Sequence, residues 1–253
     1  MDMNGVLSVV IPVYNEESTI IELVNSVLAR PEVGEVVVVN DASRDESWAR
    51  LQFFCDNPKV KLFSQEINQG KGAALIRGFQ EVTCPFVLVQ DADFEYSPTE
   101  YPRLLEPLVE GKADVVYGSR FMCTPGQVRY FRHEMGNKFL TFLSNLFSDI
   151  HLSDMETCYK VFRREVLQNL NLNSRRFGIE VEFTAKVARC RCLRIWEVPI
   201  SYRPRRYDEG KKITWKDGIA AICHILKYNV FQSTAGFYKR PWNEVLQQQS
   251  EER

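Results

Sequence analysis

The sequence of 253 residues is short of the residue patterns that build histidine metal sites and disulfide frameworks. Its three histidines, His133, His151 and His224, stand in no HxxxH or HExxH spacing, so they predict no histidine-built metal site. The seven cysteines are scattered without the spacing of a disulfide framework, and Cys190 and Cys192 have no second pair with which to hold zinc. We therefore expect unpaired thiols and a cytosolic protein.

An excess of charge is also absent, since 32 Lys and Arg residues stand against 33 Asp and Glu residues. Nucleic-acid binding proteins usually carry a basic surplus that replaces phosphate counterions, so we expect no nucleic-acid partner. The apolar stretch over 219–231 is interrupted by polar residues and is shorter than the roughly 20 residues that cross a bilayer. The first apolar run follows Asp2 rather than basic residues. We therefore expect neither a signal peptide nor a transmembrane helix.

The first half of the chain alternates short apolar runs with helical patterns. Continuous apolar runs rich in β-branched residues are typical of strands buried on both faces of a parallel sheet. Such runs cover 6–11, 35–39, 60–63, 86–89 and 114–117. Helical patterns cover 17–30, 44–56, 71–81 and 99–110. This alternation predicts an open α/β sheet, in which ligands bind beyond the carboxyl ends of the strands.

The second half of the chain does not continue the regular alternation of strands and helices. It predicts a helix over 133–147, a strand over 157–162, a helix over 178–190, a strand over 193–198 and a helix over 215–231. The last helix carries one apolar stripe. Its members are Trp215, Ile219, Ile222, Leu226 and Val230. No linker separates the two halves, so we expect one domain over 1–240 and a polar tail over 241–253.

Three acidic residues, Asp91, Asp93 and Glu95, follow the apolar run at 86–89. Alternate residues of an extended chain point to the same side, so the three carboxylates would converge and repel one another. A hard divalent cation such as Mg²⁺ or Mn²⁺ suits such oxygen ligands. Alternatively, the acidic residues form a solvated turn or cap the helix near 99. The position at a strand end favours the metal site over the turn.

Other polar residues follow neighbouring strands or open helices. Asp41 could accept hydrogen bonds from a ribose or a base, or it could cap the next helix together with Ser43. Lys71 lies in the sequence NQGKG at a helix start, where free N–H groups could face an anion, but the spacing of a Walker motif is missing. We interpret this segment as a turn with a phosphate contact.

A basic loop covers 203–212. It contains Arg203, Arg205, Arg206, Lys211 and Lys212. Arginine forks and lysine charges match the oxygens of a diphosphate, although a solvated basic loop would have the same composition. Arg120, Arg129 and Arg132 form a second and looser basic group.

Six motifs occur in a fixed order along the chain. They are VVIPVYNEE at 9–17, VNDASRD at 39–45, NQGKG at 68–72, QDAD at 90–93, GSR at 118–120 and EGKK at 209–212. Together they resemble the family 2 glycosyltransferases, in particular the dolichol-phosphate mannose synthase-like branch. The resemblance implies a GT-A fold, which is a Rossmann-like α/β fold with a mixed, mostly parallel sheet flanked by helices. It implies a nucleotide-binding half at about 6–120 and an acceptor half at about 121–231.

The resemblance also implies the reaction and the residues that carry it. Members move a hexose with inversion from a nucleotide diphosphate sugar, such as GDP-mannose or UDP-glucose, to a polyprenyl or dolichyl phosphate. The expected donor-binding residues are Pro12, Tyr14, Glu16, Val39, Asp41, Lys71, Asp91, Ala92 and Asp93. The expected metal ligands are Asp91, Asp93 and Glu95, which stands where many relatives have Gln. The expected phosphate ligands are Arg120, Arg205 and Lys211, with Arg205 preferred to Arg206 because of its six-residue spacing to Lys211.

The sequence leaves two classes of acceptor molecule open. An acceptor phosphate is already ionised and needs no base, whereas a hydroxyl group of a soluble glycan or protein favours a general base. Candidates for the acceptor side are Arg132, Asp154, Glu156, Glu180 and Glu182. A lipid acceptor implies docking at a membrane through the helix at 215–231 and the region 203–240, or a membrane-protein partner, unless the apolar stripe of that helix packs on the core.

Two other functions share parts of this pattern. A sugar nucleotidyltransferase needs a glycine-rich phosphate loop after the first strand, where this chain has Pro12 to Glu16 instead. A nucleotide-binding module without catalysis would share the donor site but not the metal-dependent turnover.

Overall fold

The protein is described from a computed structural model, which covers residues 3–122, 130–205, 215–242 and 244–245. In these residues seven strands form one sheet in the order β3-β2-β1-β4-β6-β5-β7. The strands are β1 (Leu7–Val13), β2 (Val33–Asn40), β3 (Val60–Ser64), β4 (Phe86–Val89), β5 (Val115–Ser119), β6 (Lys160–Arg163) and β7 (Ile195–Pro199). Only β6 among them runs antiparallel to its neighbours. The prediction of a mixed, mostly parallel sheet is confirmed.

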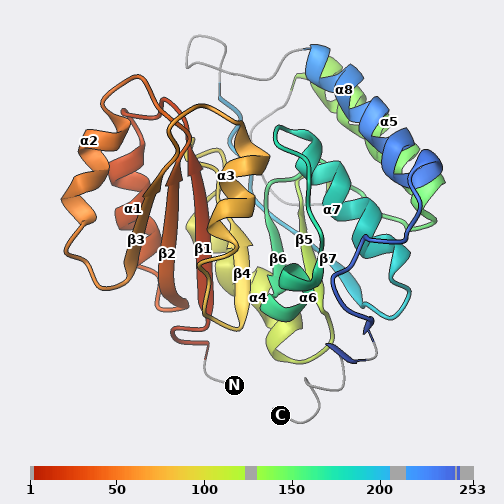
Figure 1. The fold of residues 1–253 in the computed structure, drawn as a ribbon, viewed down its shortest axis with the longest axis horizontal. Coiled ribbons are helices and arrows are strands. Elements are labelled where there is room, and N and C mark those ends of the chain that lie inside the picture. The colour runs from red at the N-terminus through yellow and green to blue at the C-terminus, as the bar shows by residue number, and fades with distance from the viewer. Residues whose placement is uncertain (1–2, 123–129, 206–214, 243, 246–253) are drawn as a thin grey trace.

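The helices of the first half follow the predicted alternation. They are α1 (Ile20–Leu28), α2 (Ser47–Leu51), α3 (Lys71–Gly78) and α4 (Tyr101–Val109). The apolar runs of β1, β2 and β4 are buried because helices cover the sheet, and Figure 1 shows α3 over its centre. Gly78 of α3 allows this close approach, since a Cβ there would lie 2.5 Å from a methyl group of Val10.

The second half adds helices outside the sheet. They are α5 (Phe131–Ser148), α6 (Arg164–Asn169), α7 (Gly178–Arg189) and α8 (Trp215–Leu226), which a π-helical turn continues over Lys227–Phe231. The short helix α6 was not predicted from the sequence. Figure 1 shows α5 and α8 side by side on the far side of α7. A small hydrophobic cluster of Met155, Val181, Ala221 and Ile225 joins them to α7.

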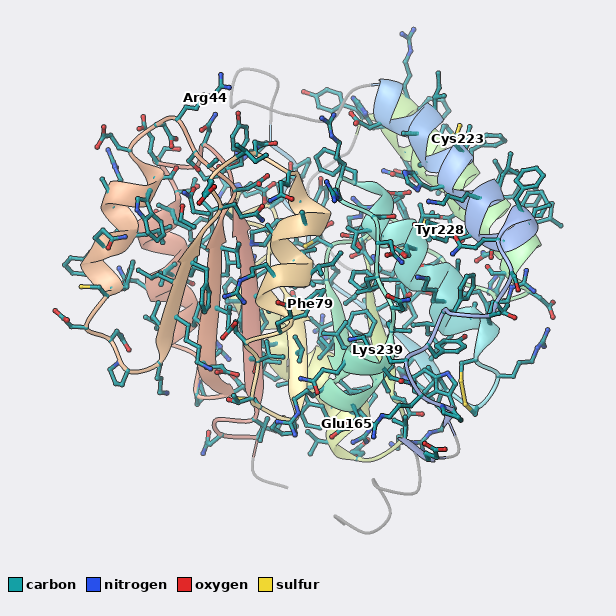
Figure 2. The ribbon with its side chains drawn as sticks, viewed as in Figure 1. Arg44, Phe79, Glu165, Cys223, Tyr228 and Lys239 are labelled. Atoms are coloured by element: carbon teal, nitrogen blue, oxygen red, sulfur yellow. A yellow bond between two sulfur atoms is a disulfide. The ribbon has the colours of Figure 1, made fainter. Side chains whose placement is uncertain are left out.

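The helix predicted over 215–231 is present, but its predicted apolar stripe is not the face that packs on the protein. Ala221, Ile225 and Tyr228 are buried, whereas Ile219 and Val230 of the stripe are half exposed. Figure 2 shows Cys223 on the outer side of α8 and Tyr228 on the side toward α7. None of the helices that the structure describes combines the length and the apolar character needed to cross a bilayer.

The prediction of unpaired cysteines is wrong for Cys190 and Cys192, which form a disulfide at the end of α7. The backbone leaves the helical conformation at Cys190. Cys55, Cys84, Cys158 and Cys223 are free.

Candidate active site

Acidic residues from β1, β2 and β4 meet at one edge of the sheet. The three strands are parallel, with Val10 paired to Val89 and Pro12 paired to Val39. Their carboxyl ends therefore lie together, and the residues that follow them, Glu16, Asp41 and Asp91, reach the same edge. The predicted donor-binding residues Pro12, Tyr14, Val39 and Ala92 lie at or just beyond these strand ends.

Asp93 lies close to the carboxylates of Asp91 and Glu95 at this edge of the sheet. Its carboxylate accepts a hydrogen bond from the backbone N–H of Glu95 at 3.1 Å. Burial, followed by the charges of Asp91 and Glu95, raises the pKa of Asp93 to about 7. A hard divalent cation relieves such a concentration of carboxylate charge, so Asp93, with Asp91 beside it, fits the role of a metal-binding group.

The three carboxylates at 91, 93 and 95 do not form the preassembled ligand group that their spacing predicts. Asp91 instead faces Lys71, whose Nζ lies 2.7 Å from Oδ1. Glu95 accepts hydrogen bonds from the hydroxyl of Tyr202 at 2.7 Å and the backbone N–H of Arg205 at 2.9 Å. No group of three His, Cys, Asp or Glu side chains within the described ranges is arranged to hold a metal ion. Ligand oxygens would have to complete the shell of a bound ion.

Arg205 joins two parts of the predicted site. Its Nη2 lies 2.8 Å from Oε2 of Glu16, and its Nε donates to the backbone carbonyl of Asp93 at 2.9 Å. The predicted phosphate ligand therefore lies directly beside the acidic edge. Arg206 and Lys211, together with most of the basic loop, Arg129 and the tail over 246–253, lie outside the described residues.

Asp41 stabilises the turn at NQGKG. Its two carboxylate oxygens accept hydrogen bonds from the N–H groups of Gln69 and Gly70, both at 2.8 Å, and burial raises its pKa. The N–H group of Ala73 donates to the carbonyl of Arg175. These three N–H groups are thus bonded within the protein, and the segment also brings the side chain of Lys71 to the site. Neither Asp41 nor Ser43 caps α2, which begins after Glu46.

Arg120 and Asp154 form a buried, two-pronged ion pair. The Nε and Nη2 atoms of Arg120 donate to Oδ2 and Oδ1 of Asp154, each at 2.7 Å, and the backbone N–H of Arg120 donates at 3.0 Å. The guanidinium also lies over the ring of Tyr202, 5.2 Å from its centre. Asp154 was a candidate base, but the structure makes it the partner that fixes Arg120.

The remaining acceptor-side candidates occupy different environments. Burial raises the pKa of Glu156 to about 7, and its Oε1 has no hydrogen-bond partner in the described part of the protein. Glu180 forms ion pairs with Lys71 and Lys160. Glu182 is bonded to Lys186 and to the N–H groups of 173 and 174, which is a structural role. Arg132 is exposed on α5.

Tyr202, which belongs to none of the six motifs, contacts both Glu95 and Arg120. Its only sequence signal is an aromatic residue just before the basic loop. Lys160 was not predicted from the sequence either, because a lysine inside a short apolar strand has no motif of its own.

Comparison with protein families matches residues 8–170 to the family described as Glycosyl transferase family 2. The chain is 31% identical over 222 residues to the low-salt glycan biosynthesis hexosyltransferase Agl6 of Haloferax volcanii. It is 29% identical over 213 residues to a dolichol-phosphate mannosyltransferase of Pyrococcus furiosus and 33% identical over 215 residues to an undecaprenyl-phosphate mannosyltransferase of Micrococcus luteus. These alignments cover 86%, 81% and 80% of this chain. The chain spans little more than half of the first two relatives, 52% and 58%, and 85% of the third.

The fold is similar to solved structures of glucosyl-3-phosphoglycerate synthase from Mycobacterium tuberculosis. The complex with Mn²⁺, UDP and phosphoglyceric acid has a TM-score of 0.69 at 21% identity and covers 90% of this chain and 79% of that one. The complex with Mg²⁺ and UDP has a TM-score of 0.68 at 22% identity, covering 90% and 80%. At this identity the similarity concerns the fold, and it confirms the GT-A fold expected from the motifs. With its ordered motifs, its sheet and the match over 8–170, the chain belongs to glycosyl transferase family 2.

Proposed function

We propose that the protein is an inverting hexosyltransferase that uses Mg²⁺ or Mn²⁺. Its donor is a nucleotide diphosphate sugar of the GDP-mannose or UDP-glucose type. Its acceptor is a polyprenyl phosphate at a membrane surface. The donor part of this proposal is supported by the edge where Asp91, Asp93 and Arg205 lie together. The acceptor part is supported by two relatives named for dolichol-phosphate and undecaprenyl-phosphate mannosyl transfer.

The chemistry follows from where charge develops. As the bond between sugar and diphosphate breaks, negative charge builds on the leaving diphosphate, and groups that stabilise it lower the barrier. Arg205 is positioned at the acidic edge by Glu16 and by the carbonyl of Asp93. A bound divalent ion would supply further positive charge to the same oxygens. Arg120, fixed by Asp154, would then serve an ionised acceptor phosphate, which attacks without a protein base.

A lipid acceptor is supported most directly by the outer face of α5. Five large apolar side chains on this helix are between 48% and 77% exposed. They are Phe131, Met135, Phe139, Phe142 and Leu146. At 3.6 residues per turn they fall within an arc of about 80°. Thr141, Ser144 and Ser148 are buried on the opposite side. Leu140, Leu143 and Phe147 pack against α7 and α8, so α5 is apolar on its solvent face as well as on its packed face.

The surroundings of this apolar face suit a bilayer with anionic headgroups. Arg132 and Lys138, which is paired with Glu134 at 2.6 Å, flank the five residues on either side, as basic residues do on helices that lie in a membrane interface. Ile219, Val230 and Phe231 extend the exposed apolar surface onto α8 and its π-helical turn. Phe121 connects the face with the site, because both Arg120 and Lys138 lie over its ring. A lipid held at this face would have its phosphate near Arg120.

The proposal is tested by measuring hexose transfer from GDP-mannose and UDP-glucose, with Mg²⁺ or Mn²⁺, to a polyprenyl phosphate. Turnover with the lipid phosphate is the expected result. Absence of turnover with every donor, under conditions where a known polyprenyl-phosphate transferase is active, would contradict it.

A hydroxyl acceptor is the second candidate, because one residue favours it. The buried carboxyl of Glu156, with a pKa of about 7 and an unbonded Oε1, has the properties of a general base for a hydroxyl group. Competition between a polyprenyl phosphate and a soluble sugar for the same donor separates the two acceptors.

The outer face of α5 yields a prediction for membrane binding. The double variant F139E/F142E is expected to bind vesicles of phosphatidylcholine and phosphatidylglycerol at least about tenfold more weakly, because burial of each phenylalanine contributes about 1.5–3 kcal/mol. The rate of hexose transfer to a short, water-soluble isoprenoid phosphate should be nearly the same in this variant as in the wild type. Co-sedimentation with vesicles measures the first effect, and a kinetic assay measures the second.

The matched control is Phe53→Glu, since Phe53 is 76% exposed in the segment that follows α2. This variant should bind vesicles like the wild type. Unchanged vesicle binding by F139E/F142E, together with a wild type that is dimeric in solution and a variant that is monomeric, would show that a second copy of the chain covers this face instead.

The pKa of Asp93 yields a prediction for metal binding. Below a pH of about 7 a proton occupies Asp93 and must leave before a cation binds, so the affinity for Mn²⁺ should rise about tenfold per pH unit up to pH 7 and then level off. Calorimetric titration of the ligand-free protein with Mn²⁺ at pH 5.5 to 8.5 measures this. An affinity that does not change over that range would argue against Asp93 as a ligand.

A further inference from the structure

A buried row of alternating charges runs from the acidic edge into the second half of the protein. Asp91 contacts Lys71 at 2.7 Å, Lys71 contacts Oε1 of Glu180 at 3.1 Å, and Oε2 of Glu180 contacts Lys160 at 2.6 Å. The four residues come from the end of β4, the start of α3, the first turn of α7 and β6. Three ion pairs thus connect elements from both halves of the chain.

The row is buried except at its Asp91 end. The side chains of Lys71, Glu180 and Lys160 are 14%, 5% and 0% exposed, whereas that of Asp91 is 22% exposed. A charge that loses its partner in such an environment is poorly solvated, so the partners hold one another firmly. Asp91 is therefore the member of the row through which the others can affect a bound molecule.

The backbone fixes the distance between Lys71 and Glu180. The start of α3 lies so close to the segment before α7 that a Cβ at Gly72 would be 2.1 Å from the carbonyl oxygen of Ser174. The N–H group of Ala73 donates to the carbonyl of Arg175 at 2.9 Å. Because these two segments are held together, Lys71 keeps its ion pair with Glu180, although Oε1 of Glu180 accepts no hydrogen bond from the described residues.

We propose that Glu180 is a positioning residue for the donor sugar nucleotide, acting through Lys71 on the carboxylate of Asp91. The inference rests on the proposed function, in which Asp91 approaches the ribose and diphosphate of the donor. Glu180 holds Lys71 from within, and Lys71 in turn sets the orientation of Asp91. Lys160 pairs with the second carboxylate oxygen of Glu180. Because Glu180 has this second cation, Lys71 stays available to pair with Asp91. Glu180, expected on the acceptor side from the sequence, thereby serves the donor side.

The test compares Glu180→Gln with Glu182→Gln. Both residues lie on α7, both are buried and both pair with a buried lysine, Lys160 or Lys186. Each variant should lower the melting temperature. Only Glu180→Gln should weaken the binding of GDP-mannose or UDP-glucose, by about tenfold in calorimetric Kd and in donor KM, with a smaller change in kcat and none in acceptor KM. Glu180→Asp, which keeps the charge but cannot reach both lysines, should fold well and weaken donor binding in the same way.

A double-variant cycle distinguishes action through Lys71 from a general loss of structure. In a Lys71→Met background, Glu180→Gln should cause no further loss of donor affinity, whereas its effect would add to that of Lys71→Met if the two residues acted separately. Additive effects, or a change in acceptor KM with unchanged donor Kd, would overturn the inference. Wild-type protein that binds the donor but transfers nothing to a polyprenyl phosphate would overturn the proposed acceptor and leave this inference standing.

Discussion

Asp93→Asn is expected to lower kcat by at least about a hundredfold while leaving the fold intact. Asparagine keeps the shape of the side chain and the hydrogen bond from the N–H of Glu95, but it removes the charge that would hold a divalent ion against the leaving diphosphate. Removing one preorganised electrostatic contribution of this kind typically costs two to three orders of magnitude, roughly 10²–10³, in kcat. Kinetics with saturating donor and Mn²⁺ measure the loss.

The same variant has an expected effect on stability with a defined sign. The pKa of Asp93 is raised to about 7 in the folded protein, so between pH 4 and 7, roughly, the folded state binds more protons than the unfolded state. The metal-free wild type should therefore lose stability from this group as pH rises through that window, and Asp93→Asn should not. At pH 8 its melting temperature should equal or exceed that of the wild type. A collapse of the melting temperature would show that Asp93 is structural.

Asp114→Asn is the matched control. Asp114 is a buried carboxylate just before β5, at the opposite end of that strand from Arg120. Although burial opposes it, the contacts with Arg194 and Arg163 hold its pKa below the usual value. Neutralising Asp114 should therefore cost stability above pH 4, roughly, and leave kcat per folded molecule unchanged. Asp93→Asn should thus lower kcat without a loss of stability, and Asp114→Asn should lower stability without a loss of kcat.

The sheet was largely predictable because its strands are buried on both faces. The run Val36–Val39 is apolar at every position, and a strand between two layers of helices accepts that pattern. The position of β6 between β4 and β5 was not predictable, because the spacing of apolar residues and the strand propensity of a segment do not indicate which strands are neighbours in the sheet. The antiparallel pairing of Leu88 with Val161 joins residues far apart in the chain.

The site was predictable as a set of residues but not as a set of contacts. Strand-end rules bring Asp91 and Asp93 to one edge, yet they do not reveal that Lys71 faces Asp91 or that Tyr202 bonds to Glu95. Such pairs depend on side-chain directions of elements that meet only in the folded protein. Lys71 of α3 pairs with Asp91, and Tyr202 and Arg205 after β7 bond to Glu95, so these two carboxylates already have partners that the spacing of the three acids does not predict.

The helix at α5 was predicted with nearly its true length, but not which of its faces would be exposed. Leu140, Leu143 and Phe147 pack toward α7, while Phe139 and Phe142 lie outside. A helix with apolar residues on two sides has no periodicity that distinguishes the packed side from the exposed one. Only the position of α7 and α8 decides it.

Asp154→Ala is expected to cause a large loss of stability, about 3–5 kcal/mol, because it leaves Arg120 as a buried charge without its carboxylate. For a chain of this size the melting temperature should fall by about 2–4 °C for each kcal/mol. Thermal or denaturant unfolding measures the change. Asp149→Ala is the control. The side chains of Asp149 and of its ion-pair partner Arg191 are each 77% exposed, so this pair should contribute less than about 1 kcal/mol to the free energy of unfolding.

A double variant separates the structural from the functional part of this ion pair. Removing both charges, as in Arg120→Met with Asp154→Leu, should restore most of the stability lost in Asp154→Ala, because apolar residues of similar volume can replace a buried ion pair at little cost. Activity should not return, since the guanidinium that would meet the acceptor phosphate is gone. Recovery of turnover together with stability would mean that Arg120 contributes only to the stability of the fold. Other basic residues at this edge of the sheet would then have to bind the acceptor phosphate.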